Sequence, residues 1–208
     1  VAGIGMSVMH DAIHCSFSSN SIVNKRFRFS CELVGANSFN WKIQHNFLHH
    51  TFTNIPGLDE DISGKAILRL EPTGPLYKIH KFQHIYALPL YSLLTLSWIV
   101  WADYFSLARY YKEGMVKQVG GRIKKEAVIM IFSKAIYLFM HFVLPIFILG
   151  FVWWHVVLGF VLMHMVSGFI LSIVFQLAHV VEGPEYPVPD NDGNIENNWA
   201  VHQLHTTA

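Results

Sequence analysis

The sequence has little charge and almost no cysteine. Charged residues make up 14% of its 208 residues, well below the roughly 25% of soluble domains, and Cys15 and Cys31 are its only cysteines. Two cysteines exclude a disulfide scaffold, and a net charge of +1 gives no reason to expect nucleic acid as a partner. Disorder is excluded as well, because 16 Phe, 8 Tyr and 6 Trp offer far too much apolar surface for an open chain.

Histidine and long apolar stretches are what the chain has in excess. It carries 13 histidines against 15 lysines and arginines together. Neutral imidazole is the commonest metal ligand in proteins, so the placement of these histidines indicates the chemistry. The chain begins at Val1 and stops at Ala208 inside a patterned segment. We therefore expect it to be a single domain, residues 1–208, truncated at both ends.

Three apolar stretches approach the ~20 residues that cross a bilayer as a helix. They cover residues 85–101, 129–150 and 152–178. The second and third are separated only around Gly150, which predicts a hairpin of two spans over about residues 129–178. Both are apolar on all sides, as expected for helices in lipid or in a buried core. The sequence therefore predicts an all-α fold, an integral membrane helical bundle.

Positive charge indicates how these stretches are oriented in the membrane. Lysine and arginine flank the first stretch on both sides, and none follows Lys134. The flanking residues are Lys65, Arg69, Lys78 and Lys81 before it and Arg109, Lys112, Lys117, Arg122, Lys124 and Lys125 after it. Because the first stretch is also the shortest and contains Pro89, we expect residues 85–101 to be interfacial or re-entrant, the alternative being an ordinary span. The segments before it and after residue 178 would then share the cytoplasmic side.

Two groups of histidines have the spacing of metal ligands. His10 and His14 are four apart, and His45, His49 and His50 form a second group about thirty residues later. Residues four apart lie on one face of a helix, so each group can direct two imidazoles to one place. His50 is rotated by ~100° from His49, which suits a second, neighbouring metal ion.

Further residues extend these two groups. His179 directly follows the third apolar stretch, at the mouth of a span, and is well placed to join a metal site there. His202 and His205 are three apart and share a helix face, and for both of them a ligand role and a packing role stay open. We expect four polar residues to orient the histidine rings through hydrogen bonds: Asp11, Gln44, Asn46 and Glu182.

Five other histidines do not join the predicted site. His80 and His84 have ligand-like spacing, but the lysines beside them disfavour a metal ion. His141, His155 and His164 lie inside the predicted hairpin without forming a cluster. For these three we expect packing or tunnel-lining roles, although an ionisable group inside a membrane is by default a functional hypothesis.

Many histidines without a cysteine pattern argue against Fe–S clusters and structural zinc. Eight or more exceed what one tetrahedral zinc can use, so two iron ions account better for their number. A di-iron pair at the membrane surface can activate O2 and attack an unactivated C–H bond, and a substrate that enters from lipid should be an acyl chain or a similar hydrocarbon. The protein would place one methylene and exclude water. Electrons must come from a partner, since the sequence has no nucleotide-binding motif.

The residues around these histidines resemble the membrane fatty acid desaturases, most closely the acyl-lipid and acyl-CoA branch that includes the front-end enzymes. Residues 9–20 look like the first histidine box of that family. Residues 41–54, followed by the acidic run at residues 59–61, look like the second box. Residues 175–182 are similar to the segment that supplies an additional ligand, and residues 199–207 look like the stretch that runs up to the last box.

The resemblance implies a di-iron enzyme that inserts a cis double bond into a fatty acyl chain, using O2 and two electrons from a carrier such as cytochrome b5 or ferredoxin. The implied iron ligands, with no catalytic residue beyond them, are His10, His14, His45, His49, His50 and His179. The last box of the family, of the Gln-x-x-His-His type, would lie beyond Ala208, so we expect the fragment alone to be inactive. The irons would form a cytoplasmic-side cap on a multi-pass protein of the endoplasmic reticulum or, in a bacterium, the inner membrane.

Two alternatives stay open. The same scaffold can perform hydroxylation, so a di-iron lipid or alkane hydroxylase is the second enzymatic hypothesis. From a different class, the chain could be a haem-binding or metal-transporting membrane protein. Transport predicts ligands near the bilayer midplane, whereas the two histidine groups lie outside the long apolar runs. The attacked carbon, the chain length and the acyl carrier are not indicated by the sequence.

Overall fold

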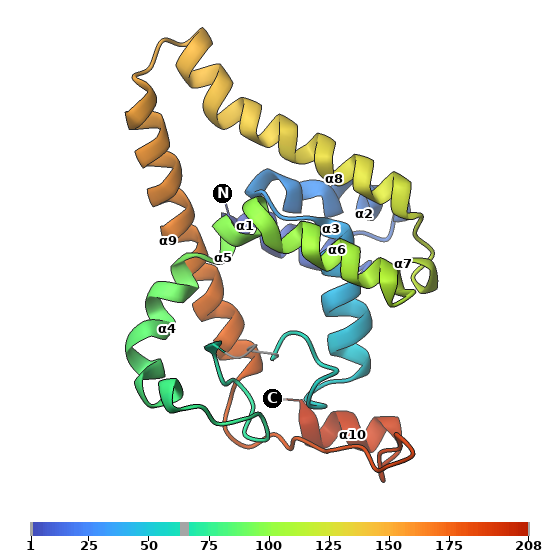
Figure 1. The fold of residues 1–208 in the computed structure, drawn as a ribbon. Helices are drawn as coiled ribbons and strands as arrows, with labels where there is room; N and C mark the ends of the chain where they lie inside the picture. Colours follow the sequence, from blue (N-terminus) through green and yellow to red (C-terminus); the bar gives the residue numbers. More distant parts are fainter. Residues whose placement is uncertain (1, 63–66, 208) are drawn as a thin grey trace. The chain divides into compact units, whose positions relative to one another are not determined.

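A computed structural model describes residues 2–62 and 67–207, and within these ranges all regular structure is helical, which confirms the predicted all-helical class (Figure 1). Lys65, whose charge entered the orientation argument, lies outside the described residues. The helices are α1 (Ala2–Ile13), α2 (Ser21–Phe27), η1 (Arg28–Val34), α3 (Ser38–Trp41), η2 (Lys42–His49), η4 (Lys78–Phe82), α4 (Gln83–Ser92), α5 (Leu94–Ser97), η5 (Trp98–Ala102), α6 (Asp103–Lys112), α7 (Met115–Gln118), α8 (Ile123–Leu138), η6 (Phe139–Ile148), α9 (Trp153–His179) and α10 (Trp199–Thr206).

The chain divides into two compact units, and each is described by itself. Unit 1 comprises Val1–Ile43 and Leu90–Ser172, and unit 2 comprises Gln44–Pro89 and Ile173–Ala208. Each unit therefore combines two segments that are far apart in the sequence. Unit 2 contains the second histidine group, His179 and the C-terminal histidines.

Among the described residues, two helices are long and apolar enough to cross a membrane. The first, Ile123–Ile148, is α8 continued by η6, and the second is α9. Figure 1 shows the two helices diverging from the short connection that contains Gly150, which has a φ of 72°. They occupy the region of the predicted hairpin, but the first begins at Ile123 because the basic turn before residue 129 is also helical. Many of their large apolar side chains, such as Phe132 and Val166, are exposed, as expected for surfaces that contact lipid.

The first apolar stretch contains a bend. A membrane span in this region would need both Lys78–Ser92 and Leu94–Lys112, because neither is long and apolar enough alone. The two helices are bent by 56° at the break between them. Pro89 lies in α4 just before this break, and proline has no N–H to donate to the preceding turn. A broken span and a re-entrant loop both have this geometry, so the interfacial placement of residues 85–101 stays a prediction.

Unit 1 buries an ion pair between α8 and α6. Nζ of Lys134 lies 2.7 Å from Oδ2 of Asp103, and it donates to the carbonyl oxygens of Gly35 at 2.8 Å and Trp98 at 2.9 Å. Asn40 Nδ2 donates to the carbonyl oxygen of Asp103 at 2.8 Å. All three ammonium protons of Lys134 therefore have an acceptor, which is what a charge buried this deeply requires.

A second polar chain in unit 1 joins α5, α8 and α9. The hydroxyl of Thr95 donates to the carbonyl oxygen of His164 at 2.9 Å, and its oxygen lies 3.0 Å from Nδ1 of the same ring. Because Thr95 has one proton, Nδ1 of His164 must donate and Nε2 must accept, from Tyr137 Oη at 2.9 Å. Gly168 permits close contact here, since a Cβ would lie 2.7 Å from the carbonyl oxygen of Ser92. These contacts give His164 a packing role.

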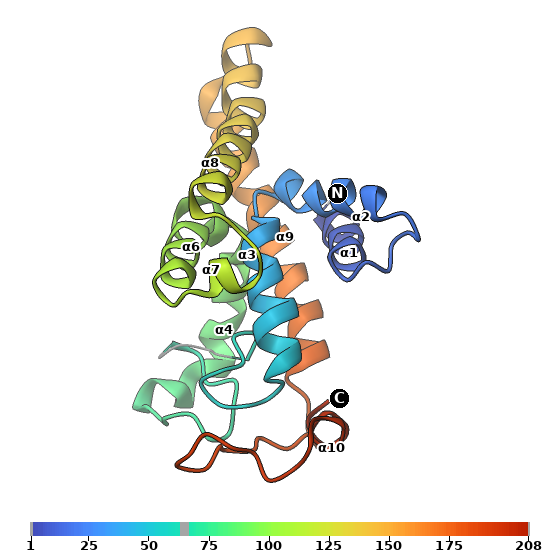
Figure 2. The ribbon, with the colours of Figure 1, turned by 90° about the vertical axis from the view of Figure 1, so that its right-hand side faces the viewer.

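Unit 2 contains the end of α9, the helix η2 and the short helix α10. Both views show α10 beside the turn that follows η2 (Figures 1 and 2). Nε2 of His202 donates to the carbonyl oxygen of Thr53 at 3.0 Å, and Asn54 Nδ2 donates to the carbonyl oxygen of Thr206 at 2.8 Å. The C-terminal helix is therefore fixed directly onto the turn beyond the second histidine group.

Candidate metal centre

The first histidine group lies at the C-terminal end of α1, in unit 1. The ring centroids of His10 and His14 are 4.6 Å apart, so the two imidazoles lie side by side as the four-residue spacing predicts. Nδ1 of His10 lies 3.1 Å from Oδ1 of Asp11, on the exposed side of the helix. Asp11 thus contacts the ring that it was predicted to orient.

The second group lies on η2, which is wound as a π-helix. Its ring centroids form a triangle: His45 is 5.2 Å from His49 and 4.7 Å from His50, and His49 is 5.1 Å from His50. A π-helix has i→i+5 hydrogen bonds and turns less per residue than an α-helix, so residues four and five positions on lie to either side of the same face. The ~100° rotation expected for His50 used α-helical geometry, and a second metal ion beside it stays a prediction. His50 directly follows the last residue of η2, and its ring contacts those of both His45 and His49.

An acidic turn closes over these histidines. Nδ1 of His45 lies 2.6 Å from Oδ2 of Asp61, and Nδ1 of His49 lies 3.0 Å from both carboxylate oxygens of Asp59. Backbone N–H groups fix the turn, because those of Asn54 and Asp61 each donate to Asp59 at 2.9 Å. The side chains of Asp59 and Asp61 are 0% and 2% exposed.

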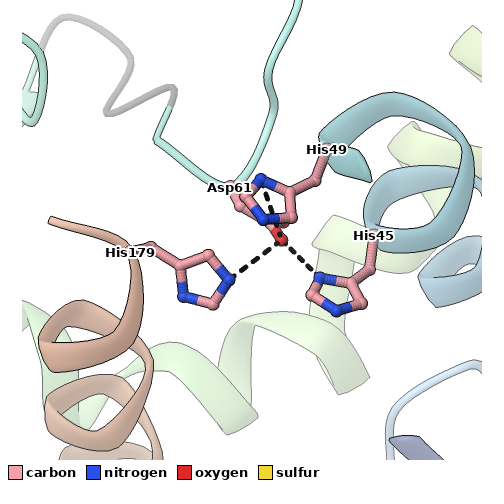
Figure 3. Close-up of side chains that lie close together, drawn as sticks. All are labelled: His45, His49, Asp61 and His179. Atoms are coloured by element: carbon pink, nitrogen blue, oxygen red, sulfur yellow. Dashed lines mark hydrogen bonds and ion pairs between the residues drawn. The ribbon is translucent and has the colours of Figure 1, made fainter. Parts of the chain in front are cut away.

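The fourth contributor, His179, is the last residue of α9. Its Nδ1 donates to the carbonyl oxygen of Phe175 at 2.8 Å, one turn earlier. Its ring centroid lies 4.7 Å from that of His49, and its Nε2 lies 3.7 Å from Oδ2 of Asp61. Figure 3 shows Asp61 between the three rings, with His45 and His49 presented by η2 and His179 by the end of α9.

The electrostatics of this cluster favour ionised carboxylate. Burial opposes ionisation of Asp61, but the hydrogen bond from His45 and the charges of His45 and His49 outweigh it and lower the pKa of Asp61 to about 2. Burial likewise opposes protonation of His49. The hydrogen bond to Asp59 and the charges of Asp61 and Asp59 outweigh that effect and raise the pKa of His49 above its ordinary value.

The protonation pattern fits a bound cation. Ionised Asp61 can only accept, so Nδ1 of His45 donates to it, and Nε2 is the ring nitrogen left to ligate a metal ion. Nδ1 of His179 is likewise used on a carbonyl, which directs its Nε2 lone pair at Asp61. A lone pair and a carboxylate at 3.7 Å need a positive charge between them, either a proton or a metal ion. Metal-bound histidines commonly hold a carboxylate or carbonyl on the other ring nitrogen.

The donor set also fits a transition metal. One ligand atom from each of His45, His49, Asp61 and His179 lies within 4.8 Å of the others. Three imidazoles and one carboxylate, with no thiolate, form a set suited to iron or zinc. The cluster is assembled from three separate segments of unit 2, so it exists only in the folded chain.

The other three residues predicted to orient the rings are Gln44, Asn46 and Glu182. Gln44 Nε2 donates to Oδ1 of Asp61 at 2.8 Å and so holds the carboxylate that holds His45. Asn46 lies on η2 between the two box histidines, and its side chain is partly buried. Glu182 makes no hydrogen bond or ion pair within the described ranges. Its predicted partner His179 is instead fixed by Phe175.

The C-terminal histidines contact other groups. His202 is buried and bonds to the carbonyl oxygen of Thr53. His205 is exposed, and its Nδ1 forms an ion pair with Glu185 at 3.0 Å. Neither belongs to the group of four ligand atoms described above.

Asp59 and Asp61 were missed as site residues in the sequence. Their acidic run was noted only as part of a resemblance, and nothing in its spacing gives the position of the turn relative to η2. The sequence nevertheless contained a chemical signal for these two aspartates. Two aspartates shortly after a histidine group, in a chain with 14 acidic residues in all, are candidates for the carboxylates that orient metal-bound imidazoles.

Comparison with known proteins gives one consistent family. The family model described as fatty acid desaturase matches residues 1–207. An sn-1 linoleoyl-lipid 6-desaturase of Synechocystis sp. is 33% identical over 211 residues, which is 100% of this chain and 57% of that protein. An acyl-lipid (8-3)-desaturase of Physcomitrium patens is 33% identical over 99% of this chain and 43% of its own length.

More distant relatives agree with this. Delta(5) fatty acid desaturase A of Dictyostelium discoideum is 31% identical over 97% of this chain and 44% of its own length. The chain spans about half the length of the curated relatives that it matches. No solved structure matches it.

Proposed function

The chain belongs to the fatty acid desaturase family, and from this premise we propose that it is the histidine-rich, membrane-embedded part of an O2-dependent fatty acyl desaturase that inserts a cis double bond. The observation that carries the proposal is the cluster of His45, His49, Asp61 and His179, whose ligand atoms lie within 4.8 Å of one another. Such a donor set, one member of which ends the apolar helix α9, suits oxidation of a substrate that dissolves in lipid.

The proposed iron ligands are His10, His14, His45, His49, His50 and His179. For the last four, the support is the mutual contact of their rings in unit 2. For His10 and His14, it is the side-by-side arrangement of the two rings at the end of α1 and the match of the family to residues 1–207. Two irons bound by such ligands supply the O2 activation that an unactivated C–H bond requires.

The chain's own residues prepare the site. Asp61 and Asp59 hold the Nδ1 protons of His45 and His49, so each ring keeps one orientation and one tautomer. Gln44 holds Asp61 in turn. Burial of both carboxylates keeps water from competing for these hydrogen bonds.

The proposed reaction is balanced by O2 and an external donor. One –CH2–CH2– unit of the acyl chain loses two hydrogen atoms and becomes –CH=CH–. Together with two electrons and two protons, these hydrogens reduce one O2 to two H2O. The electrons would come from a carrier protein such as cytochrome b5 or ferredoxin, and the acyl chain would be bound to lipid or to CoA. We place the site on the cytoplasmic side of a multi-pass membrane protein.

Product analysis tests the proposal. The full-length protein that contains this region would be expressed in yeast fed with unsaturated fatty acids, and methyl esters of total lipid would be analysed by gas chromatography and mass spectrometry. We expect a new cis-unsaturated product that disappears in the His49→Ala variant. A hydroxylated product without an unsaturated one would instead establish a hydroxylase.

Metal analysis gives a second test. Purified full-length protein should contain close to two irons per chain and show no Soret band. Zinc alone, or a haem spectrum, would overturn the di-iron proposal.

A further inference from the structure

A basic pocket lies where one apolar helix ends and the next begins, in unit 1. It has a volume of about 490 Å³, and its lining includes Tyr111, Lys112, Lys117 and Ile123. Lys112 is the last residue of the helix Leu94–Lys112, and Ile123 is the first residue of the candidate span Ile123–Ile148. Whether Leu94–Lys112 spans or re-enters, this pocket lies beside the end of a candidate membrane span.

The pocket lies in an excess of positive charge. Residues 109–126 contain six basic and two acidic side chains, a net charge of +4. Both acids already have partners, since Glu113 lies 3.8 Å from Arg109 and Glu126 lies 4.0 Å from Lys125. Over the described ranges, no carboxylate lies within ion-pair distance of the other four basic residues, which are Lys112, Lys117, Arg122 and Lys124.

The helix that leads to the pocket carries exposed aromatic rings. In α6, the residues Asp103, Leu107 and Tyr110 are buried and form one stripe along the helix. Phe105, which is 73% exposed, lies opposite this stripe, and Tyr111, which is 57% exposed, lies on its flank and lines the pocket. Aromatic rings of this kind are typical of the headgroup level of a membrane, next to basic residues that interact with anionic lipid.

We propose that this pocket binds the phosphate of an anionic phospholipid headgroup. Lys112 and Lys117 supply ammonium groups as point charges for the phosphate oxygens, and the exposed rings of α6 contact the acyl region beside it. A zwitterionic headgroup carries the same phosphate but adds a cation, which the uncompensated lysines would repel. The pocket therefore selects phosphatidylglycerol over phosphatidylcholine. This inference depends on neither the iron ligands nor the activity.

Lipid binding by the full-length protein tests the proposal. The protein would be purified in a neutral detergent, and its retention of phosphatidylglycerol and of phosphatidylcholine would be measured by native mass spectrometry. The wild type should prefer phosphatidylglycerol. K112Q/K117Q should lose about tenfold or more of that preference, since each lysine near an anionic headgroup contributes substantially.

A matched control separates the pocket from general surface charge. R122Q/K124Q removes the same charge from exposed residues outside the pocket lining and should change the preference by less than about threefold. K112R/K117R keeps the charge and should keep the preference. The proposal would be wrong if both glutamine variants lost the preference for phosphatidylglycerol equally, or if the wild type showed no such preference.

Inorganic phosphate distinguishes the source of the ligand. If millimolar phosphate fails to displace phosphatidylglycerol from the wild type, the lipid is the ligand, as proposed. If phosphate binds the detergent-solubilised protein while phosphatidylglycerol shows no preference, the pocket is a site for free phosphate and the lipid proposal is wrong. All four lysine and arginine positions in the glutamine variants are exposed, so these substitutions should leave the fold intact.

Discussion

The buried network around Lys134 in unit 1 and the buried network around Asp61 in unit 2 handle charge in opposite ways. In unit 1, the ammonium of Lys134 meets one carboxylate and two carbonyl oxygens, and its three protons are all used. In unit 2, the carboxylate of Asp61 is surrounded by the rings of His45, His49 and His179, whose charges depend on protons or on a cation. The first network is complete by itself. The second is complete only when a positive charge is supplied.

The difference indicates what each network is for. In the network around Lys134, every ammonium proton already has an acceptor, so no group is left to bind a ligand. Its role is to fix Leu94–Lys112 against α8 within unit 1. A set of imidazoles whose Nδ1 atoms are already used, and whose ligand atoms converge, is arranged for a metal ion. Breaking the first should cost folding stability, and breaking the second should cost metal and activity.

The largest effect is expected at a proposed ligand. His49→Ala removes one of the converging imidazoles and leaves Asp59 without its ring partner, so iron binding should fall and desaturation should decrease by roughly a thousandfold or more. Iron content of the purified full-length protein and fatty acid analysis of the expressing cells measure the two effects. Full iron content with unchanged activity would remove His49 from the site.

The next effect concerns unit 1 and stability. Lys134→Met leaves Asp103 buried without its cation, and breaking a buried pair in this way costs about 3–5 kcal/mol of unfolding free energy. Unfolding of the full-length protein in mixed micelles by denaturant would measure it. Iron per folded molecule should stay as in the wild type, in contrast to His49→Ala.

A double variant sharpens this result. Lys134→Met combined with Asp103→Leu removes both charges and should recover much of the lost stability. If the double variant were as unstable as the single one, the hydrogen bonds to Gly35 and Trp98 would matter more than the charge pair.

The sequence could predict what depends on local spacing. Long apolar stretches gave the two long helices around Gly150, and four-residue spacing gave the paired rings of His10 and His14. In the sequence, however, Lys134 is notable only as the last lysine or arginine of the chain. Its partner Asp103 is 31 residues away, and no periodicity relates the two.

The details of the candidate site depended on features that no local rule contains. The spacing of the second group predicted the pair His45 and His49, whereas the contact of the His50 ring with both others accompanies a π-helical winding of η2 that the spacing does not indicate. The contact between Asp59 and His49 depends on a turn in which Asn54 has a φ of 56° and donates its N–H to Asp59. Such a turn is fixed by tertiary contacts, so local spacing could not place the acidic residues at the site.

A smaller effect is expected at the orienting carboxylate. Asp61→Asn keeps the shape of the side chain but loses its negative charge, which favours the ligating tautomer of His45, so iron affinity should fall by about 10–100-fold. Competition with a coloured chelator would measure the affinity. Asp192→Asn provides the control because Asp192 is exposed in the loop before α10, and it should change the affinity by less than about threefold. Similar losses in both variants would contradict a specific role for Asp61.

The smallest effect is expected at His202, which was open between ligand and packing roles in the sequence. Its Nε2 donates to Thr53, whose hydroxyl donates to the carbonyl oxygen of His49. His202→Ala should therefore loosen the turn that positions His49 and lower iron affinity by about three- to tenfold, which corresponds to one lost buried hydrogen bond of roughly 1 kcal/mol.

His202→Gln can place an amide N–H near the position of Nε2 and should recover most of the loss, which no direct ligand would allow. His205→Ala, at an exposed ion pair, should have no effect on chelator competition. If His202→Ala lost iron as completely as His49→Ala and glutamine did not restore it, His202 would be a ligand. The metal site of unit 2 would then include α10.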